Sequence, residues 1–268
     1  MRDTENTLWV IAAVVVLGIA GVLWYLRASR EEAPVPVETP PPTEQSEPAT
    51  PHYPVPEPAT DESEAHDLVP LPPLDDSDAY FRIALVNLFG DRFGQMLVDS
   101  DLIEKSVAAL DNLTHERIAE RIRPLGHLPG SFIVEAGEDE DSYVLSPENY
   151  SRYDALVGML ASADMDSVVQ TYRRYYPLLQ QAYVNLGYPD GYLNDRVVAV
   201  IDQLLETPEP KEPIRLVRPN VLYQFEDPDL EALSSGSKLL LRMGPDNAAR
   251  VKQALRELRN RLTTSVRN

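Results

Sequence analysis

The stretch LWVIAAVVVLGIAGVLWYL, residues 8–26, contains no charged side chain and sets the plan of the chain. A helix of these nineteen residues rises about 28 Å, close to the thickness of a bilayer core, and satisfies its own backbone groups there. Trp9 lies at one end of the stretch, and Trp24 and Tyr25 lie at the other. Aromatic rings of this kind are enriched at membrane interfaces, so we interpret these three residues as interface anchors. The sequence therefore predicts a single transmembrane helix that binds the lipid bilayer.

A cleaved signal peptide is the alternative interpretation of residues 8–26. The apolar region of a signal peptide is usually about 7–15 residues long, which is shorter than this stretch, and Leu26-Arg27-Ala28 offers no small-x-small cleavage site. Charge does not fix the orientation, because Arg2 flanks one end, and Arg27 and Arg30 flank the other. By analogy with bacterial proteins of this plan, we expect residues 1–7 to be a cytoplasmic head. The same analogy predicts an inner-membrane location, with the large domain in the periplasm.

Residues 27–74 form a segment of different composition. Residues 31–81 carry thirteen acidic side chains and no lysine or arginine, and thirteen prolines lie between positions 34 and 73. Such a segment has too little apolar surface to offset the cost of ordering it, so we predict a disordered, acidic, proline-rich linker. It is interpreted either as a spacer or as a docking peptide, in PVETPPP or PLPPL, for an aromatic groove on a partner.

Charge and cysteine content exclude several classes of function. The net charge is −19, which argues against nucleic acid as a partner, because nucleic-acid binding needs a basic surface. The chain has no cysteine, so disulfide frameworks and thiolate metal sites are excluded.

From Asp75 onward the apolar residues recur at helical spacing. We predict a mainly α-helical globular domain over residues 75–268, with one or two short β-hairpins. The hairpins are expected around 132–145 and 214–225. Pro177 is expected to kink or split one helix, and Asn194 or Asp195 is expected to cap another. The expected helices cover residues 77–89, 101–122, 146–163, 164–186, 195–206 and 245–262.

Motifs that would indicate an enzyme are weak. Ser235-Gly236-Ser237-Lys238 matches the S-x-x-K pattern of penicillin-interacting enzymes, but neither S-D-N nor K-T-G accompanies it. A serine at 235 or 237 also suits a helix cap. The histidines have no second ligand at useful spacing, and the acidic run 135–141 lacks the spacing of a calcium loop. We assign no catalytic, cofactor-binding or metal-binding residue and expect no cofactor.

Tyrosines are concentrated between positions 143 and 192. Tyr172, Tyr176 and Tyr183 share one helical face, which indicates either a core stripe or an exposed aromatic platform. Helices are expected to break at Pro177 and Pro189, so the side chains beside these prolines are expected to point outward to solvent. We therefore predict a binding surface that comprises Tyr176, Tyr188, Tyr192 and Arg196.

Several long segments resemble an uncharacterised family of proteobacterial single-pass membrane proteins. These segments are LPGSF, LSPENYSRYDALV, YRRYYPLLQQAYVNLGYP, LNDRVVAVIDQLLETP and VLYQFEDPDLEALSSGSKLLLRMG. The resemblance extends over about residues 75–262. It implies a domain of unknown function and supplies no catalytic residues.

Two hypotheses follow for function. The first is a binding or adaptor domain, tethered to the membrane, that holds an envelope protein or a cell-wall polymer. The alternative is an envelope enzyme that acts on a cell-wall or polysaccharide substrate, with Asp195, Arg196 or an acid of residues 146–206 in its site. Convergent polar groups in a sizeable cleft would favour the enzyme, and a shallow tyrosine-lined surface would favour the adaptor.

Overall fold

The computed structural model describes residues 50–55, 70–126, 130–139, 141–211 and 213–264. The predicted span 8–26, its anchors Trp9, Trp24 and Tyr25, the head 1–7 and most of the linker lie outside these ranges. Within the described ranges, no helix is both long enough and apolar enough to cross a membrane.

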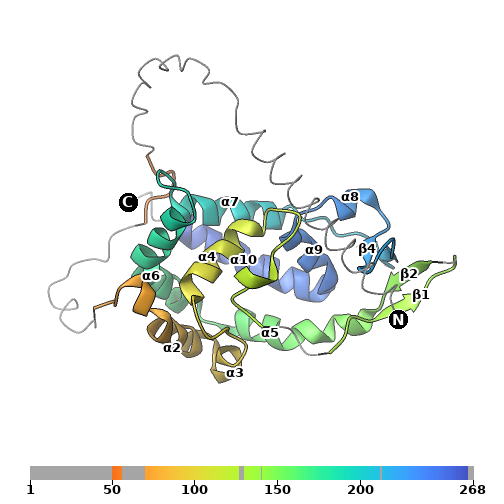
Figure 1. The fold of residues 1–268 in the computed structure, drawn as a ribbon, viewed down its shortest axis with the longest axis horizontal. Coiled ribbons are helices and arrows are strands. Elements are labelled where there is room, and N and C mark those ends of the chain that lie inside the picture. The colour runs from red at the N-terminus through yellow and green to blue at the C-terminus, as the bar shows by residue number, and fades with distance from the viewer. Residues whose placement is uncertain (1–49, 56–69, 127–129, 140, 212, 265–268) are drawn as a thin grey trace, which may run out of the picture. The chain divides into compact units, whose positions relative to one another are not determined.

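The described part of the chain is mainly helical, with one small sheet (Figure 1). In chain order the elements are η1 (Leu74–Asp76), α2 (Asp78–Phe89), α3 (Asp91–Gly94), α4 (Leu102–Asn112), η2 (Glu120–Ile122), β1 (Val134–Ala136), β2 (Ser142–Leu145), η3 (Pro147–Asn149), α5 (Ser151–Ser162), α6 (Met165–Asn185), α7 (Leu193–Leu205), β3 (Arg215–Val217), β4 (Gln224–Phe225), α8 (Pro228–Glu231), α9 (Ser235–Arg242) and α10 (Pro245–Thr264).

Helix α10 packs against α5, α6, α7 and α9, and α4 packs against α2, α6 and α7. The largest apolar core lies among α2, α3, α4, α6 and α7, where Leu102, Ile103 and Leu193 are completely or almost completely buried. Burial of each such side chain stabilises the fold by about 1.5–3 kcal/mol. The amphipathic periodicity of these helices therefore points into one shared interior, as the sequence predicted.

The two predicted hairpins form and join into one antiparallel sheet of order β1-β2-β3-β4. Strand β2 pairs with β3, so that Tyr143 lies opposite Leu216, although α5, α6 and α7 separate the two strands in sequence. Leu145, Leu216 and Phe225 pack with Leu241 of α9 in a second apolar cluster. In Figure 1 the sheet lies at the end of the domain opposite α6 and α2.

The prediction of one helix over residues 101–122 was wrong, because α4 ends at Asn112. Its last carbonyl groups bond to distant residues instead of continuing the helix. The hydroxyl of Ser235 donates to the carbonyl of Asn112 at 3.0 Å, and the N–H of Gly236 donates to that of Leu113 at 2.9 Å. Residues at the start of α9 therefore donate hydrogen bonds to carbonyl groups at the end of α4, and the chain continues from there in a turn.

Helix α6 begins as predicted and then runs through Pro177 without a break. The side chain of Asp164 caps it by accepting the N–H of Ser167 at 2.9 Å. Pro177 is exposed, so the position that lacks an N–H donor faces solvent. Tyr175 and Leu178 beside it are buried, and this packing on the core holds the helix together across the proline.

Candidate functional site

Residues 50–55, TPHYPV, belong to the predicted linker and yet pack on the helical domain; we call them the strap. Pro51, Tyr53 and Val55 are half-buried, whereas the residues between them are exposed. This alternation is the period of two that an extended chain shows when one side lies on a surface. Part of the predicted linker is therefore an ordered segment that contacts the domain.

Two adjacent residues in the first turn of α7, Asn194 and Asp195, hold the strap; we call this pair the clasp. The carboxylate of Asp195 accepts the backbone N–H groups of His52 at 2.9 Å and Tyr53 at 2.7 Å. The amide Nδ2 of Asn194 donates to the carbonyl oxygen of Tyr53 at 2.8 Å. Hydrogen bonds to an ionised carboxylate are about twice as strong as neutral ones. The clasp thus grips the main chain of the strap at two consecutive residues.

The phenol ring of Tyr53 is the side-chain anchor of the strap. It is partly buried and packs against the largest core. Its environment includes Arg259 of α10, whose guanidinium is held in turn by Asp202 of α7. The strap is therefore recognised by its main chain at the clasp and by one ring at the edge of the core.

A second layer of side chains fixes the clasp in place. The hydroxyl of Tyr172 donates to Oδ1 of Asn194 at 3.0 Å, which leaves the Asn194 amide nitrogen to face the strap. Asn194 is 1 % exposed, so its amide has no access to bulk water as a substitute partner. Burial raises the pKa of the Tyr172 phenol well above its usual range, so this donor keeps its proton.

Gln180 of α6 explains why the clasp residues are available to the strap. We predicted that Asn194 or Asp195 would cap α7, and this was wrong: Tyr192 occupies the cap position and makes no side-chain cap bond. Instead, Oε1 of Gln180 accepts the N–H of Leu193 at 2.8 Å, and Nε2 donates to the carbonyl of Gly191 at 2.7 Å. A neighbouring helix thus caps α7 and releases both polar side chains for the strap.

A separate polar network lies between α4 and α7, around Asp111 of α4. Its carboxylate accepts Nε of Arg196 at 2.7 Å and the hydroxyl of Tyr188 at 3.1 Å. Arg196 also donates to the carbonyl of Asp111 and to the hydroxyl of Thr114, at 2.8 and 2.6 Å. The hydrogen bond to the carboxylate raises the pKa of the Tyr188 phenol. This network joins α4 to α7 and places a cation at the C-terminus of α4, where the helix dipole favours it.

The sequence model of a family described as "Protein of unknown function (DUF3014)" matches residues 102–259, which is more than half of the chain. The chain belongs to the DUF3014 family. No curated protein and no solved structure matches it. The resemblance noted from the sequence is confirmed as a domain of unknown function over residues 102–259, and the family description assigns it no biochemical role.

The DUF3014 match includes both polar networks but not the strap. The clasp, Tyr172, Gln180 and the Asp111 network fall inside residues 102–259, whereas Tyr53 lies upstream. The receiving surface is thus part of the family domain, and its occupant comes from the segment that precedes it.

Three of the four residues predicted as a binding surface take part in these networks. Tyr176 supports the second layer, because its hydroxyl donates to Gln180 at 3.1 Å. Tyr192 is half-buried before α7. Tyr188 and Arg196 belong to the Asp111 network, and the Tyr188 ring, 39 % exposed, stacks on Tyr183 with centroids 4.6 Å apart.

Sequence reasoning named Asp195 only as a candidate enzyme residue or helix cap, and Asn194 only as a cap, and it missed that both residues bind Tyr53. One signal was available for Tyr53. It is the only Phe, Trp or Tyr residue between positions 26 and 79. A single large aromatic side chain in a proline-rich segment can bury much apolar surface, so it indicates where the segment contacts the domain.

The S-x-x-K motif of the DUF3014 domain has structural partners. The hydroxyl of Ser235 donates to the carbonyl of Asn112, and Nζ of Lys238 pairs with Glu231 at 2.9 Å. Ser234, and not Ser235 or Ser237 as predicted, caps α9 by accepting the N–H of Ser237 at 3.2 Å. The motif joins α9 to α4 and α8. In the described ranges, no group of three or more His, Cys, Asp or Glu side chains is placed to hold a metal ion.

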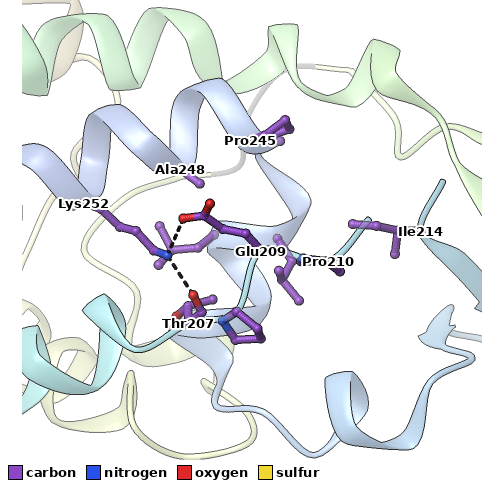
Figure 2. A pocket seen from close by; sticks show the side chains of 11 residues that line it. Thr207, Glu209, Pro210, Ile214, Pro245, Ala248 and Lys252 are labelled. Carbon is purple, nitrogen blue, oxygen red and sulfur yellow. Dashed lines mark hydrogen bonds and ion pairs between the residues drawn. The ribbon is translucent and has the colours of Figure 1, made fainter. Parts of the chain in front are cut away.

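Two hollows of the DUF3014 domain lie apart from the clasp. A cavity of about 50 Å³, lined mostly by apolar side chains, lies beside Lys252 (Figure 2). Nζ of this buried lysine donates to the carbonyl of Thr207 at 2.7 Å and to Glu209 at 3.1 Å, so it binds the segment that follows α7. A second hollow of about 170 Å³ lies among α5, α6 and α10 and is almost entirely apolar, with Arg250 on its wall. Neither hollow gathers the convergent polar groups expected of a catalytic cleft.

Proposed function

We propose that this protein is a binding or adaptor protein, and not an enzyme, and that residues 8–26 anchor it in a bacterial inner membrane with the helical domain in the periplasm. In this role the domain holds an envelope protein or a cell-wall polymer within reach of the membrane. The observation that carries the proposal is the clasp, which holds an extended segment through its main chain and one aromatic ring.

The chemistry of the clasp is that of recognition. Main-chain hydrogen bonds provide affinity for an extended segment, and the contact with one side chain provides selectivity. The carboxylate and amide of the clasp bond to peptide N–H and C=O groups, which form hydrogen bonds without reacting. A rigid second layer, with Tyr172 on Asn194 and Gln180 on the start of α7, pre-organises the clasp. Pre-organisation lowers the ordering cost of binding.

The position of the strap also sets how far the domain reaches from the proposed anchor. Residues 27–49, twenty-three residues, separate the predicted span from the strap. A chain of twenty-three residues spans at most about 80 Å. Release of the strap adds the residues up to Pro70 to this tether. A partner held by the domain thus stays within a limited distance of the membrane.

A photo-crosslinking amino acid at position 52 tests the binding role in the native membrane. The His52 side chain is exposed, and only its backbone N–H bonds to Asp195, so the substitution keeps the strap contact. A control crosslinker replaces Val221, which is 87 % exposed and lies between β3 and β4. We expect one reproducible adduct with a partner from position 52, and we expect this adduct to be absent when the crosslinker is at position 221. Adducts confined to the chain itself would contradict a binding role.

Membrane orientation is tested separately with reporters at the C-terminus of the full chain. Alkaline phosphatase fused after Asn268 should be active, and a green fluorescent protein at the same joint should be dark, if the domain is periplasmic. The opposite pattern would place the domain in the cytoplasm and overturn that part of the proposal.

A further inference from the structure

The geometry points to the strap as a built-in occupant of a peptide site, and we propose that the clasp takes in its place an extended segment of a partner protein. The class of ligand is a peptide with an aromatic residue followed by proline. This inference rests on the proposed function and deepens it, because it names the chemistry of the partner and the device that restrains binding.

The contacts at the clasp do not depend on the side chains of the strap. Within the described residues, each hydrogen bond between strap and clasp uses a main-chain atom: the N–H of His52, and the N–H and C=O of Tyr53. Every peptide offers such groups, so a segment from another protein forms the same three bonds. The Tyr53 ring adds the contact that distinguishes one segment from another.

The same contacts determine which peptide sequences fit the clasp. The residues at positions 52 and 53 each donate an N–H, so neither position accepts proline. Positions 51 and 54 are proline in the strap, and neither requires a donor. A residue before proline avoids the helical region, so Pro54 keeps Tyr53 extended before it binds. The expected ligand therefore reads proline, any residue but proline, aromatic, proline, with the first proline dispensable.

The position of the strap in the chain makes it a competitor of such a ligand. Fourteen residues, 56–69, join Val55 to Pro70 on the domain. A segment attached to its own site by so short a connection has an effective concentration on the order of millimolar. The apparent affinity for a partner equals the intrinsic affinity of the clasp multiplied by the fraction of molecules whose clasp is free of the strap. Loss of the strap contact should thus raise apparent affinity without any change in the clasp itself.

The test measures binding of a fluorescein-labelled peptide of sequence PATPHYPVPEP, residues 48–58, to the full-length protein in detergent micelles. We compare the wild type with Tyr53→Ala, whose strap has lost its ring. The apparent dissociation constant is expected to fall at least tenfold in Tyr53→Ala, because a strap without its ring competes less strongly for the clasp. Equal affinity for the two proteins would show that the strap does not restrain the site, and would overturn the inference.

Variants of the clasp and of the peptide make the test specific. In the Tyr53→Ala protein, Asp195→Asn should weaken peptide binding at least tenfold. Asp190→Asn, an exposed acid in the turn before α7, should leave it unchanged. On the peptide, Tyr→Ala and His→Pro should each abolish binding, and replacement of the first proline by alanine should change it less than threefold. The peptide variants keep the test decisive if a protein variant fails to fold, and equal binding by all peptides would overturn the inference.

Two further outcomes separate this inference from the proposed function. If the crosslinker at position 52 still captures its partner in Asp195→Asn while the peptide binds no protein, the protein is an adaptor that works through another surface, and this inference fails. If light scattering shows a dimer of the wild type that Tyr53→Ala abolishes, the occupant is the strap of a second copy, and the heterologous partner is overturned.

Discussion

The two carboxylates at the centre of the polar networks, Asp111 and Asp195, are used in opposite ways. Asp111 is 4 % exposed and is neutralised by Arg196, a charged side chain of the same compact domain. Asp195 is half-buried and bonds to backbone N–H groups of a segment 142 and 143 residues away in sequence. The first carboxylate is part of what holds the helices together. The second binds the main chain of a segment at the edge of the domain.

The largest expected effect belongs to the Asp111 network. Asp111→Ala should lower the free energy of unfolding by about 3–5 kcal/mol, because it leaves Arg196 partly buried without its carboxylate partner. Urea unfolding followed by circular dichroism measures this loss. Asp195→Ala is the matched control and should cost far less. A loss below about 1 kcal/mol for Asp111→Ala would mean that the network contributes little to the fold.

An intermediate effect is expected for the second layer of the clasp. Tyr172→Phe leaves Oδ1 of the buried Asn194 unpaired, which should cost about 1–3 kcal/mol. Tyr176→Phe is the control, because Oε1 of Gln180 keeps the N–H of Leu193 as a donor. Equal losses in the two variants, measured by chemical unfolding at pH 7, would contradict the special role of the Tyr172 hydroxyl.

The raised pKa of Tyr172 predicts how this difference depends on pH. In the unfolded chain its phenol titrates near pH 10, whereas burial keeps it protonated in the fold to higher pH. The stabilising contribution is therefore complete below pH 10 and is lost as pH rises above it, by about 1.4 kcal/mol per pH unit. Tyr172→Phe has no phenol at this position and so lacks this loss of stability, and its deficit relative to the wild type should shrink between pH 10 and 11. A deficit that stays constant over this range would show that burial does not shift the tyrosine.

The smallest effect on global stability is expected at the clasp. Asp195→Asn should change the free energy of unfolding by less than about 1 kcal/mol, because segments at the edge of a domain open locally at low cost. The strap should nevertheless loosen, since a neutral amide accepts more weakly than a carboxylate. Hydrogen exchange measured by mass spectrometry should become at least tenfold faster at the amides of His52 and Tyr53. Unchanged exchange there would mean that the carboxylate does not hold the strap.

Much of the local structure was predictable because it depends on neighbours in sequence. The Asp164 cap, the long α6, the amphipathic α7 and α10, and the two hairpins each rest on patterns within about twenty residues. The candidate site was predicted only in its region. A binding surface was expected on α6, α7 and the turn between them. Tyr176 supports the clasp, and Tyr188 and Arg196 belong to the Asp111 network. The clasp residues were expected to be helix caps, with Asp195 also a candidate in the enzyme alternative.

The sequence by itself therefore determined which segments are helical, which are extended and where the composition changes. These properties follow from hydrophobic period, caps and proline, all of which act over a few residues. Only the tertiary structure decided where α4 ends, how the two hairpins join, and what the polar residues of α7 bind. In each of these cases the partners are separated by tens of residues or more, as Ser235 is from Asn112 and Tyr53 from Asp195. A polar group forms its hydrogen bond with whichever partner the packing of the core brings within reach, and no local pattern in the sequence records that choice.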